Sequence, residues 1–315
     1  MKLRTAFSVA FLFVFVLQGF ASEPISILSI NVRCSTANDG KDNWAHRKDL
    51  LLETIRQHDY DFIGGQEVVI HPDEGKNQLK FLTEKLTEYG VLACCREKDP
   101  NKGEAMPVFY RKDRWRPDKD FQGTFWFSDT PEVPGSNTWK GQSQCPRIAT
   151  GALFHEIKNG KDTGTKLFVY STHFDHVGET ARQKSAELIM HRLMPKDDGP
   201  QVPIVVMGDF NCGEESPAVR FIKGETVELD GEMKKPPMKL VDSFRSAHPE
   251  EKDVATFHGF KGTAYTYNNV NKIGAKIDYI FVTPDIKTLE AEIIRTNDND
   301  RYPTDHYPIR ATIRL

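Results

Sequence analysis

The apolar run Ile204-Val205-Val206-Met207 leads directly into Gly208-Asp209-Phe210-Asn211. The run predicts a buried strand, and in an extended segment positions i and i+2 point the same way. The carboxylate of Asp209 and the carboxamide of Asn211 would therefore leave one strand end on the same side. Because Asp and Asn are also ordinary turn residues, the segment is informative only if other strand ends carry matching groups.

Matching polar side chains do stand at the ends of the other predicted strands. They are Asn31 after the strand at 25–30, Glu67 after 62–63, His173 after 168–170, Asp278 before 279–282, and Asp305 and His306 before 309–313. Strand ends held by a rigid sheet are common places for catalytic residues. We therefore expect these side chains to form one site.

The residue types at these strand ends indicate a chemistry. Asn31, Glu67, Asp209 and Asp305 offer oxygen atoms to a hard cation, and Mg²⁺ commonly binds one or two carboxylates together with water and phosphate. Two histidines with carboxylates nearby suit proton transfer. The combination predicts metal-assisted hydrolysis of a phosphoester.

The remainder of the chain predicts a single α/β domain over residues 23–315. Helical spacing occurs at 46–58, 77–89 and 179–193, and further strands are expected at 107–110, 166–170, 203–207, 240–242 and 276–282. Residues 113–145 show no clear period, and we expect loops and short strands there. Strands and helices without a regular alternation favour two packed sheets with helices outside them.

Residues 1–22 have the pattern of a secretory signal peptide: a basic start, a short apolar stretch and small residues before Glu23. A retained anchor is the alternative, although the stretch is short for a membrane span. We expect a periplasmic or secreted protein without an integral membrane segment, acting as a monomer. Loss of Lys2 and Arg4 with the leader would change the formal net charge from −3 to about −5, which disfavours broad, salt-driven binding to nucleic acids.

The five cysteines contain no CxxC pair, so a structural zinc site is not expected. Export would permit disulfides, but an odd number leaves at least one cysteine unpaired. We expect all five to act mainly as small buried hydrophobic residues.

The chain resembles the endonuclease/exonuclease/phosphatase superfamily in a secreted bacterial-type form. The resemblance lies in six segments that follow the order of the family and cover nearly the whole mature chain. They are Ser29-Ile30-Asn31, Gly65-Gln66-Glu67, Ser171-Thr172-His173, Gly208-Asp209-Phe210-Asn211, Ile277-Asp278-Tyr279 and Thr304-Asp305-His306. It implies a four-layer α/β-sandwich of two packed, mostly antiparallel sheets flanked by helices, with Mg²⁺ or Mn²⁺ as cofactor.

The resemblance also implies a role for each site residue. Glu67 would be the principal metal ligand, completed by Asn31 and Asp305. Asp209 would orient or deprotonate the attacking water, and Asn211 would bind the scissile phosphate. The remaining roles are phosphate contact for His306, support of its ring by Asp278, phosphate contact or leaving-group assistance for His173, and phosphate binding for Arg147.

The substrate class stays open at this level. A nuclease acting on DNA or RNA, a phosphatase acting on a small ester and a sphingomyelinase-like lipase would share these residues. Asp175 and His176 form an extra pair after His173, and neither they nor His258 receive a role. A zinc hydrolase with an H-x-H-x-D-H motif would lack its first histidine at Ser171, and an inactive binding protein would be expected to lack Glu67, Asp209 or His306.

Overall fold

The computed structural model describes residues 22–193, 202–252, 254–264 and 276–315, and the predicted leader falls almost wholly outside them. Two six-stranded sheets form the centre. The first has the order β15(Lys287–Ile293), β16(Ile309–Arg314), β1(Ile25–Asn31), β2(Phe62–Gln66), β6(Val108–Arg111), β4(Tyr89–Leu92). The second has the order β13(Val241–Asp242), β14(Asp278–Val282), β10(Ile204–Asp209), β9(Lys161–His173), β8(Ile148–Lys158), β7(Trp115–Trp126).

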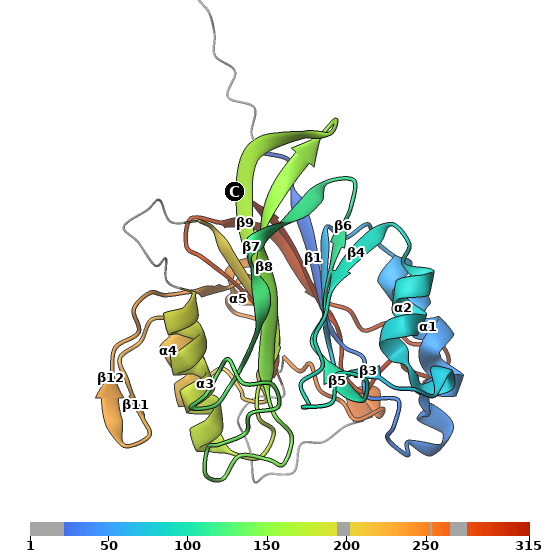
Figure 1. Cartoon of the computed structure of the whole chain (residues 1–315), viewed down its shortest axis with the longest axis horizontal. Helices are drawn as coiled ribbons and strands as arrows, with labels where there is room; N and C mark the ends of the chain where they lie inside the picture. The colour runs from blue at the N-terminus through green and yellow to red at the C-terminus, as the bar shows by residue number, and fades with distance from the viewer. Residues whose placement is uncertain (1–21, 194–201, 253, 265–275) are drawn as a thin grey trace, which may run out of the picture.

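Helices cover the outer face of each sheet, which gives four layers (Figure 1). The helices α1(Trp44–Arg56) and α2(Gln78–Lys85) lie outside the first sheet, and α3(Glu179–Arg192) and α4(Pro217–Ile222) lie outside the second. The smaller elements are α5(Ser243–Ala247), the hairpin β11(Val227–Leu229)–β12(Glu232–Lys234) and the pair β3(Val68–Ile70)–β5(Gly103–Ala105). Two of the ladders, β1–β2 and β9–β10, are parallel and the others are antiparallel. The predicted sandwich is confirmed.

Apolar side chains on both faces of the central strands explain why β10 reads as a continuous apolar run and why β1, in which small serines interrupt the apolar residues, is buried on both faces rather than on one. In β10, Val205 and Met207 belong to the core between the two sheets, whereas Val206 belongs to the core under α3 and α4. In β1, Ile27 faces the inter-sheet core and Leu28 faces the core under α1 and α2. A strand buried on both faces needs no polar alternation.

The same alternation places the polar strand ends in a common space. Continuing the inward-facing positions in steps of two leads from Ile27 to Asn31, from Val169 to His173 and from Met207 to Asp209. The antiparallel neighbour β14 starts at Asp278, directly opposite Asp209 in the ladder. Strand register therefore brings these side chains from both sheets to one edge of the inter-sheet space.

Some elements differ from the sequence-based prediction. Residues 115–126, expected as loops and short strands, form the long edge strand β7, in which a register shift between Pro117 and Gln122 hides the alternation. Proline is tolerated there because an edge strand has one unpaired side. The helix expected at 77–89 ends at Lys85, because Tyr89 pairs with Arg111 in the first sheet.

Two other predictions concern the cysteines and the membrane. All five cysteines are free; Cys95 and Cys212 are buried as predicted, whereas Cys34, Cys94 and Cys145 are only partly buried. Among the residues whose positions are given, every helix is too short or too polar to cross a lipid bilayer.

Candidate active site

Asp209 lies at the centre of the predicted site, where its carboxylate meets groups from both sheets. Its Oδ2 accepts from Asn31 Nδ2 at 3.1 Å and lies 3.4 Å from His173 Nε2 and 3.7 Å from His306 Nε2. Its Oδ1 accepts from the Asn211 backbone N–H at 2.8 Å. Burial, helped by the charge of Asp278, raises the pKa of Asp209 to about 7, against the opposing effect of His306.

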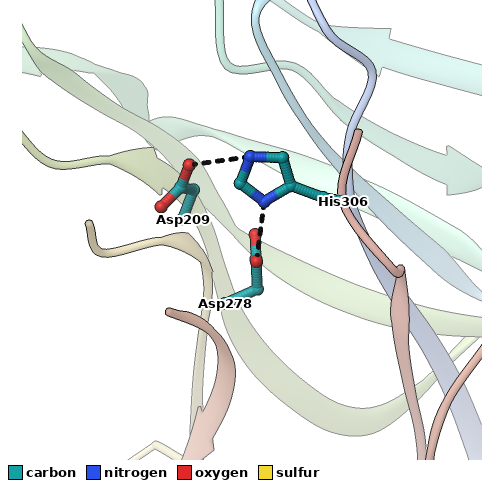
Figure 2. Close-up of side chains that lie close together, drawn as sticks. All are labelled: Asp209, Asp278 and His306. Atoms are coloured by element: carbon teal, nitrogen blue, oxygen red, sulfur yellow. Dashed lines mark hydrogen bonds and ion pairs between the residues drawn. The ribbon is translucent and has the colours of Figure 1, made fainter. Parts of the chain in front are cut away.

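His306 stands between two carboxylates (Figure 2). Its Nδ1 is 2.9 Å from Asp278 Oδ2, and its Nε2 faces Asp209 on the other side. Burial alone would lower the pKa of His306, but the charge and hydrogen bond of Asp278 outweigh it and raise the pKa to about 10. The ring is therefore an imidazolium at neutral pH, as expected for an imidazole oriented by a carboxylate.

His173 has the opposite electrostatic environment. Burial and the neighbouring charge of Arg147 hold the pKa of His173 well below its usual value. Its Nε2 lies 2.9 Å from Asn211 Nδ2, which also donates to the Phe174 carbonyl at 3.0 Å. The two histidines of the site therefore differ in charge: His306 is cationic and His173 is neutral.

Glu67 follows β2 in a backbone conformation that is uncommon for a residue with a side chain, with φ of 58°. This turn directs its carboxylate back toward β1, where Oε1 accepts from Asn31 Nδ2 at 3.1 Å and Oε2 accepts from Cys34 N at 3.0 Å. Burial would raise the pKa of Glu67, but the bond from Asn31 and the charge of His306 lower it on balance. Strained backbone of this kind is often found at functional sites.

Asp305 lies beside His306 on the segment that leads into β16. It is 6% exposed, and its Oδ2 is 3.7 Å from Arg33 Nε. Burial and the nearby charge of Glu67 raise the pKa of Asp305. The adjacent Thr304 hydroxyl donates to the Asn31 carbonyl at 2.6 Å, which ties the Asp305 segment to the end of β1.

The oxygen-rich side of this site fits a hard divalent cation. Asn31 Nδ2 lies 3.1 Å from both Glu67 Oε1 and Asp209 Oδ2, so a neutral amide group separates the buried Asp209 carboxylate from the partly buried Glu67 carboxylate. Carboxylate and amide oxygens of Glu67, Asn31 and Asp305 are the donors that Mg²⁺ and Mn²⁺ prefer. A second grouping, in which ligand atoms of Asp209, Asp278 and His306 all lie within 4.8 Å of one another, contains an imidazolium, whose two protonated nitrogens have no lone pair to offer a metal. We therefore favour the Glu67 side for a metal.

Arg147 neighbours His173 electrostatically, and its direct contacts are with the two residues to which the sequence assigned no role. Its Nη2 is 2.6 Å from His176 Nδ1 and its Nε is 3.7 Å from Asp175 Oδ2, while Nε and Nη1 are buried without a hydrogen-bond partner. Asp175 is fully buried, and its carboxylate accepts from the backbone of Ser143, Val177 and Gly178. Asp175 therefore organises two loops, and phosphate binding by Arg147 stays a prediction.

Several buried charged or polar residues around the site were not predicted. Arg47 of α1 is 2% exposed, although it lies on the apolar stripe with Leu51 and Ile55, and a charge on such a stripe was the signal that could have identified it. Arg96 pairs with Glu104 at 2.7 Å, and burial raises the pKa of Glu104 to about 7. His258, left without a role, stacks on Tyr307 at 4.1 Å and donates its backbone N–H to the Asp305 carbonyl at 2.9 Å.

Comparison with known protein families shows which family the chain belongs to. The model of the endonuclease/exonuclease/phosphatase family matches residues 28–306, a range that contains every predicted site residue. The chain belongs to this family. Its members are hydrolases of phosphoesters, so the predicted reaction class is confirmed at this level.

Two solved structures are similar over nearly their whole length. An endonuclease/exonuclease/phosphatase protein of Bacteroides vulgatus is 31% identical, with a TM-score of 0.73 over 93% of this chain and 100% of that chain. A mannosyl-6-phosphatase of Bacteroides thetaiotaomicron is 26% identical, with a TM-score of 0.74 over 92% and 99%. An uncharacterized protein of Acanthamoeba polyphaga mimivirus is 25% identical over 172 residues, which is 55% of this chain and 60% of that protein.

Proposed function

We propose that this protein is an exported, Mg²⁺- or Mn²⁺-dependent hydrolase of small phosphate esters that acts as a monomer in the periplasm or outside the cell. The observation that carries the proposal is the convergence on one carboxylate, Asp209, of a cationic imidazole, a neutral imidazole and an amide group. A pKa of about 7 suits a group that accepts a proton from water near neutral pH.

Each side chain of the site has its own role in an in-line displacement at phosphorus. Asp209 orients the attacking water and takes its proton. His306, held as an imidazolium by Asp278, stabilises negative charge on the phosphoryl oxygens. Asn211 would donate to the phosphate in exchange for one of the two hydrogen bonds that its Nδ2 makes to His173 and Phe174, and the neutral His173 beside it contacts the phosphate or the leaving group. Arg147 would add a second positive charge if it reaches the substrate.

Glu67, Asn31 and Asp305 would hold the divalent cation, which supplies Lewis-acid stabilisation of the charge that develops on the phosphoryl group. Support for the metal comes from the donor set and from the buried carboxylates on that side. Support for export comes from the pattern of residues 1–22 alone.

A small ester is favoured over nucleic acid as substrate. The formal net charge of −3 disfavours a broad contact with a polyanion. The similar mannosyl-6-phosphatase adds a sugar phosphate to the substrates worth testing first. A sphingomyelinase-like or nuclease activity would use the same catalytic groups, so a parallel assay of the substrates must distinguish these activities.

The proposal is tested by assaying the purified protein with Mg²⁺ or Mn²⁺ on mannose 6-phosphate, an inositol phosphate, sphingomyelin, RNA and single-stranded DNA in parallel. We expect turnover of a small phosphate ester that stops on addition of EDTA and returns with the metal. Glu67→Gln should lose both the activity and most of the Mn²⁺ affinity. Ligand binding without turnover of any ester would favour an inactive binding protein, and activity that persists in EDTA would exclude the metal mechanism.

A further inference from the structure

Arg47 is a buried cation. Its guanidinium donates hydrogen bonds to backbone carbonyls of the two segments that carry the candidate metal ligands Asn31 and Asp305. Its Nη1 donates to the Val32 carbonyl at 2.6 Å and to the Pro303 carbonyl at 3.1 Å. Its Nη2 donates to the Arg33 carbonyl at 2.7 Å, and its Nε donates to the Asp42 carbonyl at 3.0 Å. The bond from Arg47 to Pro303 alone spans 256 positions of the chain.

The acceptors flank the ligands closely in sequence. Val32 and Arg33 directly follow Asn31, and Pro303 lies two residues before Asp305. A planar guanidinium presents its donors in a fixed fork, so the carbonyls that it binds are held at a set separation. A more flexible ammonium group could not bind all these acceptors in one geometry.

Arg47 has no carboxylate within ion-pair distance among the residues described. Its charge is instead balanced at longer range by Asp305 and Asp39, and burial lowers the pKa of Arg47 to about 10. Its guanidinium also lies 5.3 Å from the ring centroid of Trp44 and 5.7 Å from that of Phe260. A buried cation is costly, so a cation whose hydrogen bonds all go to carbonyl groups points to a positional demand at those groups.

Two further contacts act on the same segments. The Thr304 hydroxyl donates to the Asn31 carbonyl at 2.6 Å. The Arg33 backbone N–H donates to Asn31 Oδ1 at 2.9 Å, and Arg33 has φ of 54°, so the turn after β1 is strained and needs support.

We infer that Arg47 is a positioning residue for the metal centre, which holds the Asn31 and Asp305 segments at the separation needed for their side chains to share one divalent cation with Glu67. The inference rests on the proposed function, since it concerns the same metal site. Residues that orient metal ligands typically contribute about 10- to 100-fold to metal affinity.

The test uses Mn²⁺ binding to the metal-free protein, measured by calorimetry, together with thermal unfolding in EDTA. Arg47→Lys should bind Mn²⁺ at least about tenfold more weakly, and saturating Mn²⁺ should restore most of kcat. Arg114→Lys is the control, because Arg114 also joins distant segments, through the Pro24 carbonyl, Asp61 Oδ1 and Glu156 Oε1, at the edge remote from the site. It should lose a similar amount of thermal stability and keep its Mn²⁺ affinity.

Equal weakening of Mn²⁺ binding in both variants, or unchanged binding in Arg47→Lys, would overturn the inference. If Arg47→Lys does not fold, Thr304→Val removes the neighbouring tie, and unchanged Mn²⁺ affinity in that variant would count against the inference. Glu67→Gln separates the two claims. If that variant binds Mn²⁺ normally, the metal assignment and the inference both fail. If Glu67→Gln loses Mn²⁺ binding while Arg47→Lys keeps it, the proposed function stands and Arg47 is not a positioning residue for the metal.

Discussion

The two sheets hold their halves of the site by different means. On the second sheet, Asp209 is paired across the ladder with His173 on one side and with Asp278 on the other. On the first sheet, Asn31 ends a strand, but Glu67 and Asp305 lie beyond strand ends. Their segments are fixed by a positive φ at Glu67 and by single side-chain donors such as Thr304.

This contrast separates two kinds of vulnerability. Within the acid–base half, Asp209, His173 and Asp278 are fixed by strand register, so their arrangement should fail only when the second sheet is disturbed or when one of them is replaced. The proposed metal half depends on a few hydrogen bonds to backbone carbonyls, so it should be possible to weaken it while the fold stays intact. The substitutions below test this contrast, beginning with the largest expected effect.

Asp209→Asn should reduce kcat by about 10³-fold, because an amide cannot accept the proton of water and general bases contribute roughly 10² to 10⁴. The fold should remain stable, since the change removes a buried carboxylate from a crowded charge cluster. Steady-state kinetics and thermal unfolding measure the two effects. A kcat within about tenfold of the wild-type value would remove Asp209 from the role of base.

Gly208→Ala should lower the free energy of unfolding by about 3 kcal/mol or more. Gly208 has φ of 156°, and a Cβ there would lie 2.0 Å from the Thr172 carbonyl oxygen, which belongs to the neighbouring strand backbone. The β9–β10 register would have to shift, and His173 and Asp209 would shift with it. Urea unfolding gives the stability. A stable variant with normal kcat would show that register does not fix the acid–base half.

The lowered pKa of His258, which lies beside Asp305 in the metal half of the site, predicts that the stability of the protein depends on pH. Burial lowers the pKa of His258 from 6.5 to about 4, so the unfolded chain binds a proton there between these pH values and the folded protein does not. Stability should fall as the pH falls from about 6.5 to 4, by up to about 3 kcal/mol. Urea unfolding at about pH 7 and 4.5 should show a smaller fall for His258→Gln. Equal falls for the two proteins would contradict this assignment.

Gly64→Ala in β2 is the matched partner of Gly208→Ala and should cost only about 1 kcal/mol. A Cβ at Gly64 would lie 2.7 Å from side-chain atoms of Met207, and a methionine side chain can change its rotamer. Urea unfolding of the two alanine variants side by side compares their losses in the free energy of unfolding. A loss at Gly64 as large as that at Gly208 would mean that the inter-sheet packing is as intolerant as the strand register.

The sequence predicted much of the site because its members occupy strand ends with a two-residue period. Asp209, Asn31 and His173 are examples, and their convergence follows from alternation along the strands. Contacts between distant segments could not be predicted in this way. The guanidinium of Arg47 binds the Pro303 carbonyl, and no local pattern encodes such a partner. The long strand β7 was missed because its bulge removes the period on which the prediction relies.

The position of β16 in the first sheet has a consequence for biosynthesis. β16 lies between β15 and β1, so the last strand of the chain pairs with the first one. His306 and Asp305 immediately precede it. A chain synthesised from its N-terminus cannot assemble the site until residues 305–314 have been made and β16 has paired with β1. Contacts between such distant segments form slowly. Nascent chains, and chains truncated before β16, should therefore not hydrolyse phosphate esters.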